Sequence, residues 1–232
     1  MKNKRQIVRA VCLTAALLCF LLAMRTHWGY QSEQIRYEHI RQAALKEAKE
    51  PERPTGADIL RGQEKQRAWK EPFALKEEQL LAKNPDYACW IYIPGTIISY
   101  PVTWREADNA FYLTHGFDGE KASCGSLFAD GAYEPFSEHV TVIHGHNMRD
   151  GSMFGSLKQY LNRDFLQEFP YIYVCRAGMW KRFIVFDCMV RPAGKVFDGL
   201  LNPEREELML VTCRGKRQRL MVRAFLDEGE MQ

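Results

Sequence analysis

A cysteine at the end of an apolar run has the residue type and surroundings that nucleophilic chemistry requires. Residues 208–212 (Leu-Met-Leu-Val-Thr) lead to Cys213, a turn containing Gly215 follows, and a second apolar run begins at Arg219. A short turn places the end of one strand beside the start of the next, so we expect Cys213 and Arg219 to be neighbours. A thiol attacks a carbonyl as the thiolate, which nearby cations favour, and an arginine can stabilise the oxyanion that forms. The pattern indicates a cysteine nucleophile with Arg219 as its cation.

Arg223 competes with Arg219 for this role. Residues 219, 221 and 223 lie on one face of a strand, because side chains alternate with a period of two. We favour Arg219 because it lies closer to the end of the strand that carries Cys213.

Two histidines provide candidates for proton transfer. The apolar run 141–143 stops at His144, and Gly145 separates it from His146. A histidine at the end of a core strand, beside a glycine that leaves room for a substrate, suits acid/base work near neutral pH. A histidine that is merely hydrogen-bonded at a strand end is the plainer interpretation. Metal binding is a weaker one, since a zinc site needs more ligands than this pair, and none stands at ligand spacing.

The elements that must position these residues are mostly strands. Short apolar runs, rich in β-branched and aromatic residues and bounded by Gly, Pro, Asn and Asp, are typical of strands. They cover residues 89–93, 97–102, 125–129, 139–144, 171–176, 182–190, 207–212 and 219–226. Helical patterns are few, at residues 75–82, 152–160 and 164–169. We therefore predict a mainly β domain, a small closed or nearly closed barrel with short helices.

The N-terminal segment predicts a membrane helix. Residues 1–9 are rich in Lys and Arg, residues 10–24 carry no charge, and Arg25 closes the run. The run is shorter than the roughly 20 residues of a membrane span, but it lengthens if Arg9 reaches the headgroups. A cleaved signal peptide is the rival, yet no small-x-small cleavage site follows Met24. The basic flank predicts a cytoplasmic N-terminus and an extracellular remainder.

The chain therefore divides into three predicted parts. Residues 1–30 form a cytoplasmic tip and transmembrane signal-anchor, and residues 31–72 form an extracellular stalk or linker that Pro51 and Pro54 interrupt. Residues 73–232 form the catalytic domain. The formal net charge is only +3, and the basic residues are spread along the chain, so nothing favours a nucleic-acid partner.

The remaining cysteines give no sign of chemistry. The chain has 7 cysteines without a CxxC pair, and two lie in the predicted anchor, leaving an odd number outside. At least one outer thiol is thus free unless it pairs with another molecule. Cys175 and Cys188 lie in apolar runs, where buried inert thiols are expected. Cys89 and Cys124 receive no role.

These segments resemble class B sortases. Residues 145–154 (Gly-His-Asn-Met-Arg-Asp-Gly-Ser-Met-Phe), with Leu157 and Tyr160, look like their histidine segment, and Leu-Val-Thr-Cys213 with Arg219 resembles their cysteine and arginine segment. The similarity covers about residues 75–226, and the motifs stand in the family's order. Further agreeing stretches are residues 84–86 (Asn-Pro-Asp), 90–96, 100–102, 112–113, 116–119 and 125–128.

The resemblance implies an eight-stranded sortase barrel and a membrane-bound, extracellular cysteine transpeptidase of Gram-positive bacteria. Such an enzyme cleaves a C-terminal sorting motif of a secreted protein and holds the acyl group as a thioester. It then transfers that group to an amine of a peptidoglycan precursor or of a pilin lysine. By this resemblance Cys213 is the nucleophile, His146 the acid/base, and Arg219 the oxyanion-side cation. No metal or organic cofactor is implied.

Three departures and two alternatives stand beside this interpretation. Class B members typically insert a long helix where this chain has only residues 191–206, so the substrate groove is expected to differ. Val211 stands where serine is frequent in the family, and His144 stands where tyrosine is common. A membrane-anchored cysteine peptidase of the same fold would carry the same residues. A membrane-tethered binding module without catalysis would not need Cys213.

Overall fold

The computed structural model describes residues 2–45, 69–137, 140–197 and 205–228. The chain divides into two compact units, Met1–His39 and Ile40–Gln232. The second unit holds all the strands and every residue for which we expect chemistry.

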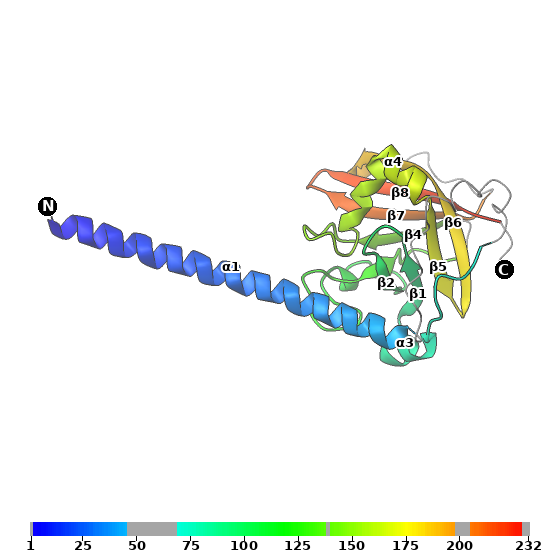
Figure 1. Cartoon of the computed structure of the whole chain (residues 1–232), viewed down its shortest axis with the longest axis horizontal. Helices are drawn as coiled ribbons and strands as arrows, with labels where there is room; N and C mark the ends of the chain where they lie inside the picture. Colours follow the sequence, from blue (N-terminus) through cyan, green and yellow to red (C-terminus); the bar gives the residue numbers. More distant parts are fainter. Residues whose placement is uncertain (1, 46–68, 138–139, 198–204, 229–232) are drawn as a thin grey trace. The chain divides into compact units, whose positions relative to one another are not determined.

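The second unit is built around a closed β-barrel with the strand order β1-β2-β3-β4-β7-β8-β6-β5. Two neighbouring pairs are parallel, β2 with β3 and β4 with β7, and the other pairs are antiparallel (Figure 1). The predicted mainly β barrel is thus confirmed, and each apolar run of the sequence overlaps one strand. The strands are β1 Tyr87–Tyr92, β2 Ser99–Thr103, β3 Leu127–Ala129, β4 Val140–Gly145, β5 Tyr171–Arg176, β6 Met179–Pro192, β7 Glu207–Arg214 and β8 Gln218–Leu226.

Strand β7 reads as a continuous apolar run because both of its faces are covered. Leu208 and Leu210 share one face of the strand and are fully buried. Met209 and Val211 lie on the outer face, where they cluster with Val196 from the connection between β6 and β7. Strands buried on both faces lose the alternation of a half-exposed strand. The short connection therefore covers the outer face of the strand that carries Cys213.

Short helices complete this unit, at α3 (Glu77–Lys83), η1 (Phe111–Leu113), η2 (Gly155–Leu161), α4 (Arg163–Glu168) and η3 (Ala193–Lys195). The helical turns predicted for residues 152–160 and 164–169 correspond to η2 and α4. The helix predicted from residue 75 begins later, at Glu77. The reason is that Leu75 forms a β-bridge with Leu45, and the Lys76 N–H donates to the Ala44 carbonyl at 2.8 Å.

A single helix, α1 (Lys2–Ala44), contains the predicted anchor and the first part of the predicted stalk. Within the described residues, no helix has both the length and the apolar character needed to cross a membrane. Residues 46–68, with Pro51, Pro54 and most of the polar stretch predicted before Pro72, lie outside the described residues.

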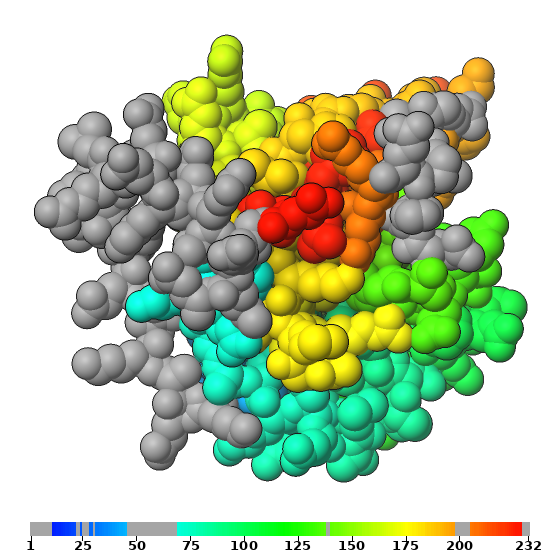
Figure 2. Space-filling model, turned by 90° about the vertical axis from the view of Figure 1, so that its right-hand side faces the viewer, coloured from blue at the N-terminus to red at the C-terminus, as the bar shows by residue number. Residues whose placement is uncertain are grey.

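Strand direction decides which residues meet at each end of the barrel. Because β4 and β7 are parallel, they end at the same side, and β8 begins there because it returns antiparallel from β7. Figure 2 shows the end of β8 in red, between β7 in orange and β6 in yellow. Cys213 and Arg219 lie at the opposite end of this ribbon, where β7 ends and β8 begins.

Candidate active site

The β7–β8 hairpin places Cys213 directly opposite Arg219. The two residues are register partners in the antiparallel ladder, as the turn predicted. Gly215 has a φ of +69°, a left-handed conformation that glycine adopts at little cost and that this tight turn requires. Directly opposed residues project from the same face of a sheet. The exposed Cys213 side chain therefore shares its face with the half-buried Arg219.

Arg223 lies on the same face but is committed to a buried carboxylate. Its Nε and Nη2 atoms donate to the two oxygens of Glu207 at 2.5 and 3.0 Å. The Glu207 side chain is fully buried, so its charge depends on this partner. Of the two candidate arginines, Arg219 is thus the one that lies beside Cys213 and has no ion pair within the described residues.

The His146 ring is oriented by a main-chain carbonyl. Its Nε2 lies 2.8 Å from the carbonyl oxygen of Leu113 in η1. A carbonyl oxygen only accepts, so Nε2 must carry a proton in this contact. In the neutral ring, Nδ1 is then the nitrogen that takes up a proton. The contact thereby selects which ring nitrogen is available for acid/base work.

Strand pairing and a side-chain hydrogen bond bring His146 to the cysteine. Gly145 pairs with Thr212 across the parallel β4–β7 ladder, so the next residues on the two strands are His146 and Cys213. The Thr212 hydroxyl donates to the Gly145 carbonyl at 2.7 Å. The Asn147 Nδ2 donates to the carbonyl of Cys213, also at 2.7 Å. These bonds fix the histidine loop to the end of the cysteine strand.

Sequence reasoning missed Asn147 and Leu113. Asn147 had one available signal, a polar amide directly after the candidate histidine. Leu113 contributes only its backbone carbonyl. A backbone atom has no residue-type signature, so no pattern could have indicated it.

The expectation that Gly145 leaves room for a substrate is wrong. A β-carbon at this position would collide with the Leu127 side chain and would lie 2.9 Å from the Phe154 ring. Gly145 is required because two core side chains press against the strand there. It allows close packing under the histidine loop and does not open a space for substrate.

His144 performs a structural task. Its Nε2 lies 3.0 Å from Asp130 Oδ2, and its ring packs against Phe128 with centroids 5.3 Å apart. Hydrogen bonding by His144, supported by the Ala132 backbone N–H and the Asn109 amide, holds the pKa of Asp130 well below its usual range. Because His144 is bound to Asp130, we assign the acid/base role to His146 and not to His144.

We predict that Asp130→Asn lowers stability in a pH-dependent way. A carboxyl whose folded pKa is depressed stabilises the fold above its unfolded pKa of about 3.9, and the contribution is lost as pH falls through the folded pKa. We expect the variant to be about 1 kcal/mol less stable at pH 7. Urea unfolding at pH 7 and pH 3 measures the difference in unfolding free energy between the variant and the parent. This difference should be smaller at pH 3. A difference of equal size at both values would refute the charge-based explanation.

Cys89 and Cys175 are buried and Cys188 is partly buried, so the environment of these thiols differs from that of Cys213. Burial raises the pKa of the Cys89 and Cys175 thiols well above the usual range, and that of Cys188 to about 12. These thiols remain protonated, and therefore poorly nucleophilic, at neutral pH. Among the thiols of the barrel unit, Cys213 alone is exposed.

The other features of the described part of the chain do not suggest a different centre. No group of three or more His, Cys, Asp or Glu side chains there could hold a metal ion. A cavity of about 420 Å³ contains none of Cys213, His146 and Arg219. Its lining consists of Pro85, Asp86, Tyr87, Ala88, Trp104, Arg105, Glu106, Glu134, Pro135 and Arg176.

Comparison with known proteins identifies the family. The sortase domain model matches residues 91–227, more than half of the chain. The chain belongs to the sortase family. This match covers strands β2 to β8 and the last two residues of β1, and it includes the three residues of the candidate active site.

The relatives place this sortase domain in class B. Sortase B of Listeria monocytogenes is 44% identical over 90 residues, which are 38% of this chain and 35% of that protein. The structure of Clostridium perfringens sortase B shares 30% identity with a TM-score of 0.61, and the match covers 66% of this chain and 100% of that one. A Staphylococcus aureus sortase B–substrate complex has a TM-score of 0.65 at 21% identity, and the match covers 86% of this chain and 98% of that one. At this identity the likeness supports the fold alone. The curated Listeria relative is thus matched over about a third of its length.

Proposed function

We propose that the chain is a cysteine transpeptidase in which Cys213, His146 and Arg219 carry the reaction. One observation supports this above all. The β7–β8 register sets Arg219 opposite Cys213, and the β4–β7 register brings His146 to the same end of the barrel. Two elements that are distant in the sequence thus supply a thiol, an imidazole and a guanidinium to one exposed site, the set that acyl transfer through a thioester requires.

The first half of the proposed reaction forms a thioester. The Cys213 thiol passes its proton to His146, and the thiolate sulfur attacks the scissile carbonyl carbon of the donor peptide, so that the carbonyl oxygen gains negative charge. Arg219, beside the sulfur, stabilises that oxyanion with its planar N–H donors. When the carbon–nitrogen bond breaks, His146 gives a proton to the departing amine. The donor remains bound to Cys213 as an acyl-enzyme.

The second half transfers the acyl group. An incoming amine attacks the thioester carbonyl, and His146 removes a proton from it as the new amide bond forms. The carbon–sulfur bond then breaks and returns Cys213 to its starting state. We infer that the donor is the sorting motif of a secreted protein, and that the amine belongs to a peptidoglycan precursor or a pilin lysine. The family membership supports the donor class.

Product analysis tests the proposal against the peptidase alternative. The full chain is incubated with a panel of sorting-motif peptides, with and without an excess of an amine such as triglycine. Mass spectrometry should find the acyl group on Cys213 and, with the amine present, an amide product. Free acid as the only product under saturating amine would show a peptidase. Acylation of another cysteine would refute the site assignment.

Arg219 provides a prediction that separates it from Arg223. We expect Arg219→Lys to lower kcat/KM by about 10- to 100-fold, because an ammonium keeps the charge but loses the planar donors. Arg223→Lys is the matched control. It should mainly lower the unfolding free energy, since its guanidinium bonds both oxygens of the buried Glu207. Kinetics give kcat/KM and urea unfolding gives the unfolding free energy of both variants. A large loss of kcat/KM in Arg223→Lys, with Arg219→Lys nearly as active as the parent, would assign the role to Arg223.

We also propose that residues 1–30 anchor the chain in the membrane, with residues 31–72 as stalk and 73–232 as an extracellular catalytic domain. The basic residues before the uncharged run 10–24, and the helical conformation of α1 through it, support this. Because the run is short, the anchor depends on Arg9 reaching the headgroups. Membrane fractionation and protease treatment of intact cells test it. Recovery of the full-length chain in the soluble fraction would refute it.

A further inference from the structure

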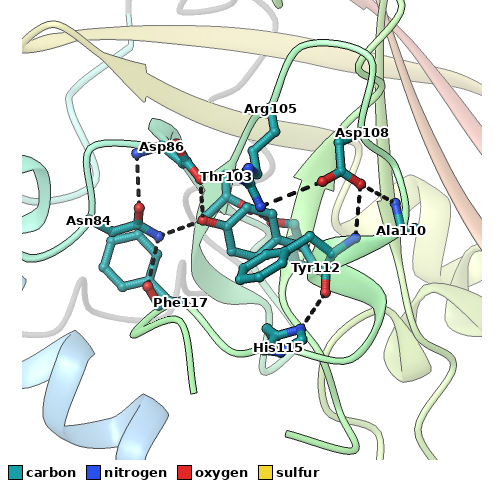
Figure 3. A network of polar contacts seen from close by, with 11 residues as sticks. Asn84, Asp86, Thr103, Arg105, Asp108, Ala110, Tyr112, His115 and Phe117 are labelled. Atoms are coloured by element: carbon teal, nitrogen blue, oxygen red, sulfur yellow. Dashed lines mark hydrogen bonds and ion pairs between the residues drawn. The ribbon is translucent and has the colours of Figure 1, made fainter. Parts of the chain in front are cut away.

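The short helix that carries the carbonyl partner of His146 rests on a buried polar network (Figure 3). Tyr112, in the middle of η1, is 2% exposed, and its hydroxyl has two partners. It accepts a hydrogen bond from Asn84 Nδ2 at 2.9 Å and donates to Asp86 Oδ2 at 2.8 Å. We call Asn84, Asp86 and Tyr112 the brace. It connects the end of α3 and the chain before β1 to η1.

The Asn84 side chain is held in one orientation by its other bonds. Its Nδ2 also donates to the Phe117 carbonyl at 2.7 Å, and its Oδ1 accepts from the Asp86 N–H at 2.8 Å. Asn84 is 6% exposed, so each of these bonds compensates for lost contact with water. Burial raises the pKa of Tyr112 well above its usual range, which keeps its hydroxyl protonated and able to donate to Asp86.

The two ends of η1 are also fixed. Asp108 accepts from the backbone N–H groups of Ala110 and Phe111 at 3.0 and 3.1 Å, and these bonds lower the pKa of its carboxyl. His115 Nδ1 donates to the Phe111 carbonyl at 2.9 Å, and the two rings stack with centroids 4.1 Å apart. Figure 3 shows Asp108 with Ala110, and His115, around Tyr112.

The backbone of η1 is confined on its remaining side by Gly125. A β-carbon at Gly125 would lie 2.5 Å from the Tyr112 carbonyl oxygen and 2.9 Å from that of Leu113. The Ser126 N–H donates to the Tyr112 carbonyl at 2.9 Å. The Leu113 side chain itself is 42% exposed and contributes little packing. A three-residue 3-10 helix has little stability of its own, so its position depends on the brace and on these contacts.

We propose that Tyr112, held by Asn84 and Asp86, is a positioning residue for His146. The brace fixes η1, η1 fixes the Leu113 carbonyl, and that carbonyl keeps the proton on Nε2 and the ring in one orientation. The effect of the brace on catalysis rests on the proposed function of His146; its effect on the ring does not. This assigns a task to the Asn84-Pro-Asp segment, which the sequence comparison alone left without one.

The physical basis is the accuracy that proton transfer demands. A catalytic group displaced by about 1 Å can lose on the order of 100-fold in rate. Without the Tyr112 hydroxyl, the Asn84 N–H and the Asp86 carboxylate each lose a partner. Helix η1 then loses the two hydrogen bonds that connect it to Asn84 and Asp86. Leu113 can then shift relative to β4, and the His146 ring loses the acceptor that selects its tautomer.

The test compares Tyr112→Phe with Tyr160→Phe in the full chain. Tyr160 is a matched control because it is 2% exposed and its hydroxyl donates to the Phe169 carbonyl at 3.1 Å. Each protein is labelled with ¹⁵N-histidine, and long-range ¹H–¹⁵N spectra report which ring nitrogen of His146 is protonated. The His146→Gln spectrum assigns the signals. Acylation kinetics with a sorting-motif peptide give kcat and KM.

We expect Tyr112→Phe to show mixed tautomers of His146 and about a 10-fold lower kcat, with KM changed less than about twofold. Tyr160→Phe should keep the Nε2–H tautomer and the parent kcat. Asp86→Ala, at a partly exposed position, should repeat the tautomer change if Tyr112→Phe folds poorly. Parent-like spectra in both brace variants, or an equal loss of kcat in Tyr160→Phe, would overturn the inference.

The two proposals fail in different ways. If the parent protein forms no thioester but Tyr112→Phe still changes the His146 tautomer, the proposed function fails and the structural link stands. If the parent is acylated on Cys213 and the brace variants match it in both spectra and kinetics, the proposed function stands and the brace has no positioning role.

Discussion

Replacing Cys213 with alanine should abolish acyl transfer and leave the fold intact. The thioester forms on this sulfur, so its removal leaves no covalent route, and we expect kcat/KM to fall by about 10⁴-fold or more. The exposed side chain contributes little packing, and its hydrogen bond from Asn147 uses the backbone carbonyl, which alanine keeps. Peptide turnover gives kcat/KM, intact-protein mass spectrometry detects the acyl group on the protein, and thermal unfolding reports whether the fold is intact.

Cys188→Ala is the control for this result. Cys188 lies on β6, is partly buried, and has a thiol whose pKa burial raises to about 12. We expect this variant to keep the parent's turnover and acylation while losing some stability. Retained function in Cys213→Ala would favour the non-catalytic binding module, and loss of turnover only in Cys188→Ala would move the nucleophile to another strand.

His146→Ala should have the second largest effect, about a 10³-fold loss of kcat/KM. Without the imidazole, the departing amine receives no proton from the enzyme, and the incoming amine loses its general base. The fold should tolerate the change because the ring is half-buried and bonds only a main-chain carbonyl of the neighbouring η1. The rates of acylation and of amide formation, measured separately, should both fall.

His144→Ala separates the two histidines. His144 bonds Asp130 at 3.0 Å, so its loss leaves a partly buried carboxylate without its main partner. We expect a loss of about 1 to 2 kcal/mol in unfolding free energy and turnover within a few-fold of the parent. A large loss of turnover in folded His144→Ala, with His146→Ala nearly active, would reverse the assignment.

The bonds around Cys213 and His146 explain why these predictions concern rate more than stability. Thr212 and Asn147 fasten the histidine loop to the cysteine strand through main-chain carbonyls. Because these contacts use the side chains of Thr212 and Asn147 and not those of Cys213 and His146, the two candidate catalytic side chains remain at the surface. They can be removed without leaving a cavity in the core.

The sequence alone determined the fold class and the candidate thiol site. Runs of β-branched and aromatic residues predicted every strand of the barrel. These side chains fit the pleated surface of a strand that packs on a core, so they gather in short segments where strands form. The Cys213–Arg219 pair was also predictable. Its partners lie on consecutive strands, and a short turn leaves little freedom in how they pair.

Only the tertiary structure decided how the second half of the site is assembled. Asn147 and Cys213 are 66 residues apart, and β5 and β6 intervene, so their contact depends on the parallel β4–β7 pairing that no local pattern encodes. The Leu113 carbonyl contact and the crowding at Gly145 likewise join segments that no local pattern brings together. Residue spacing specifies local pairs, whereas long-range contacts depend on the order in which the strands close the barrel.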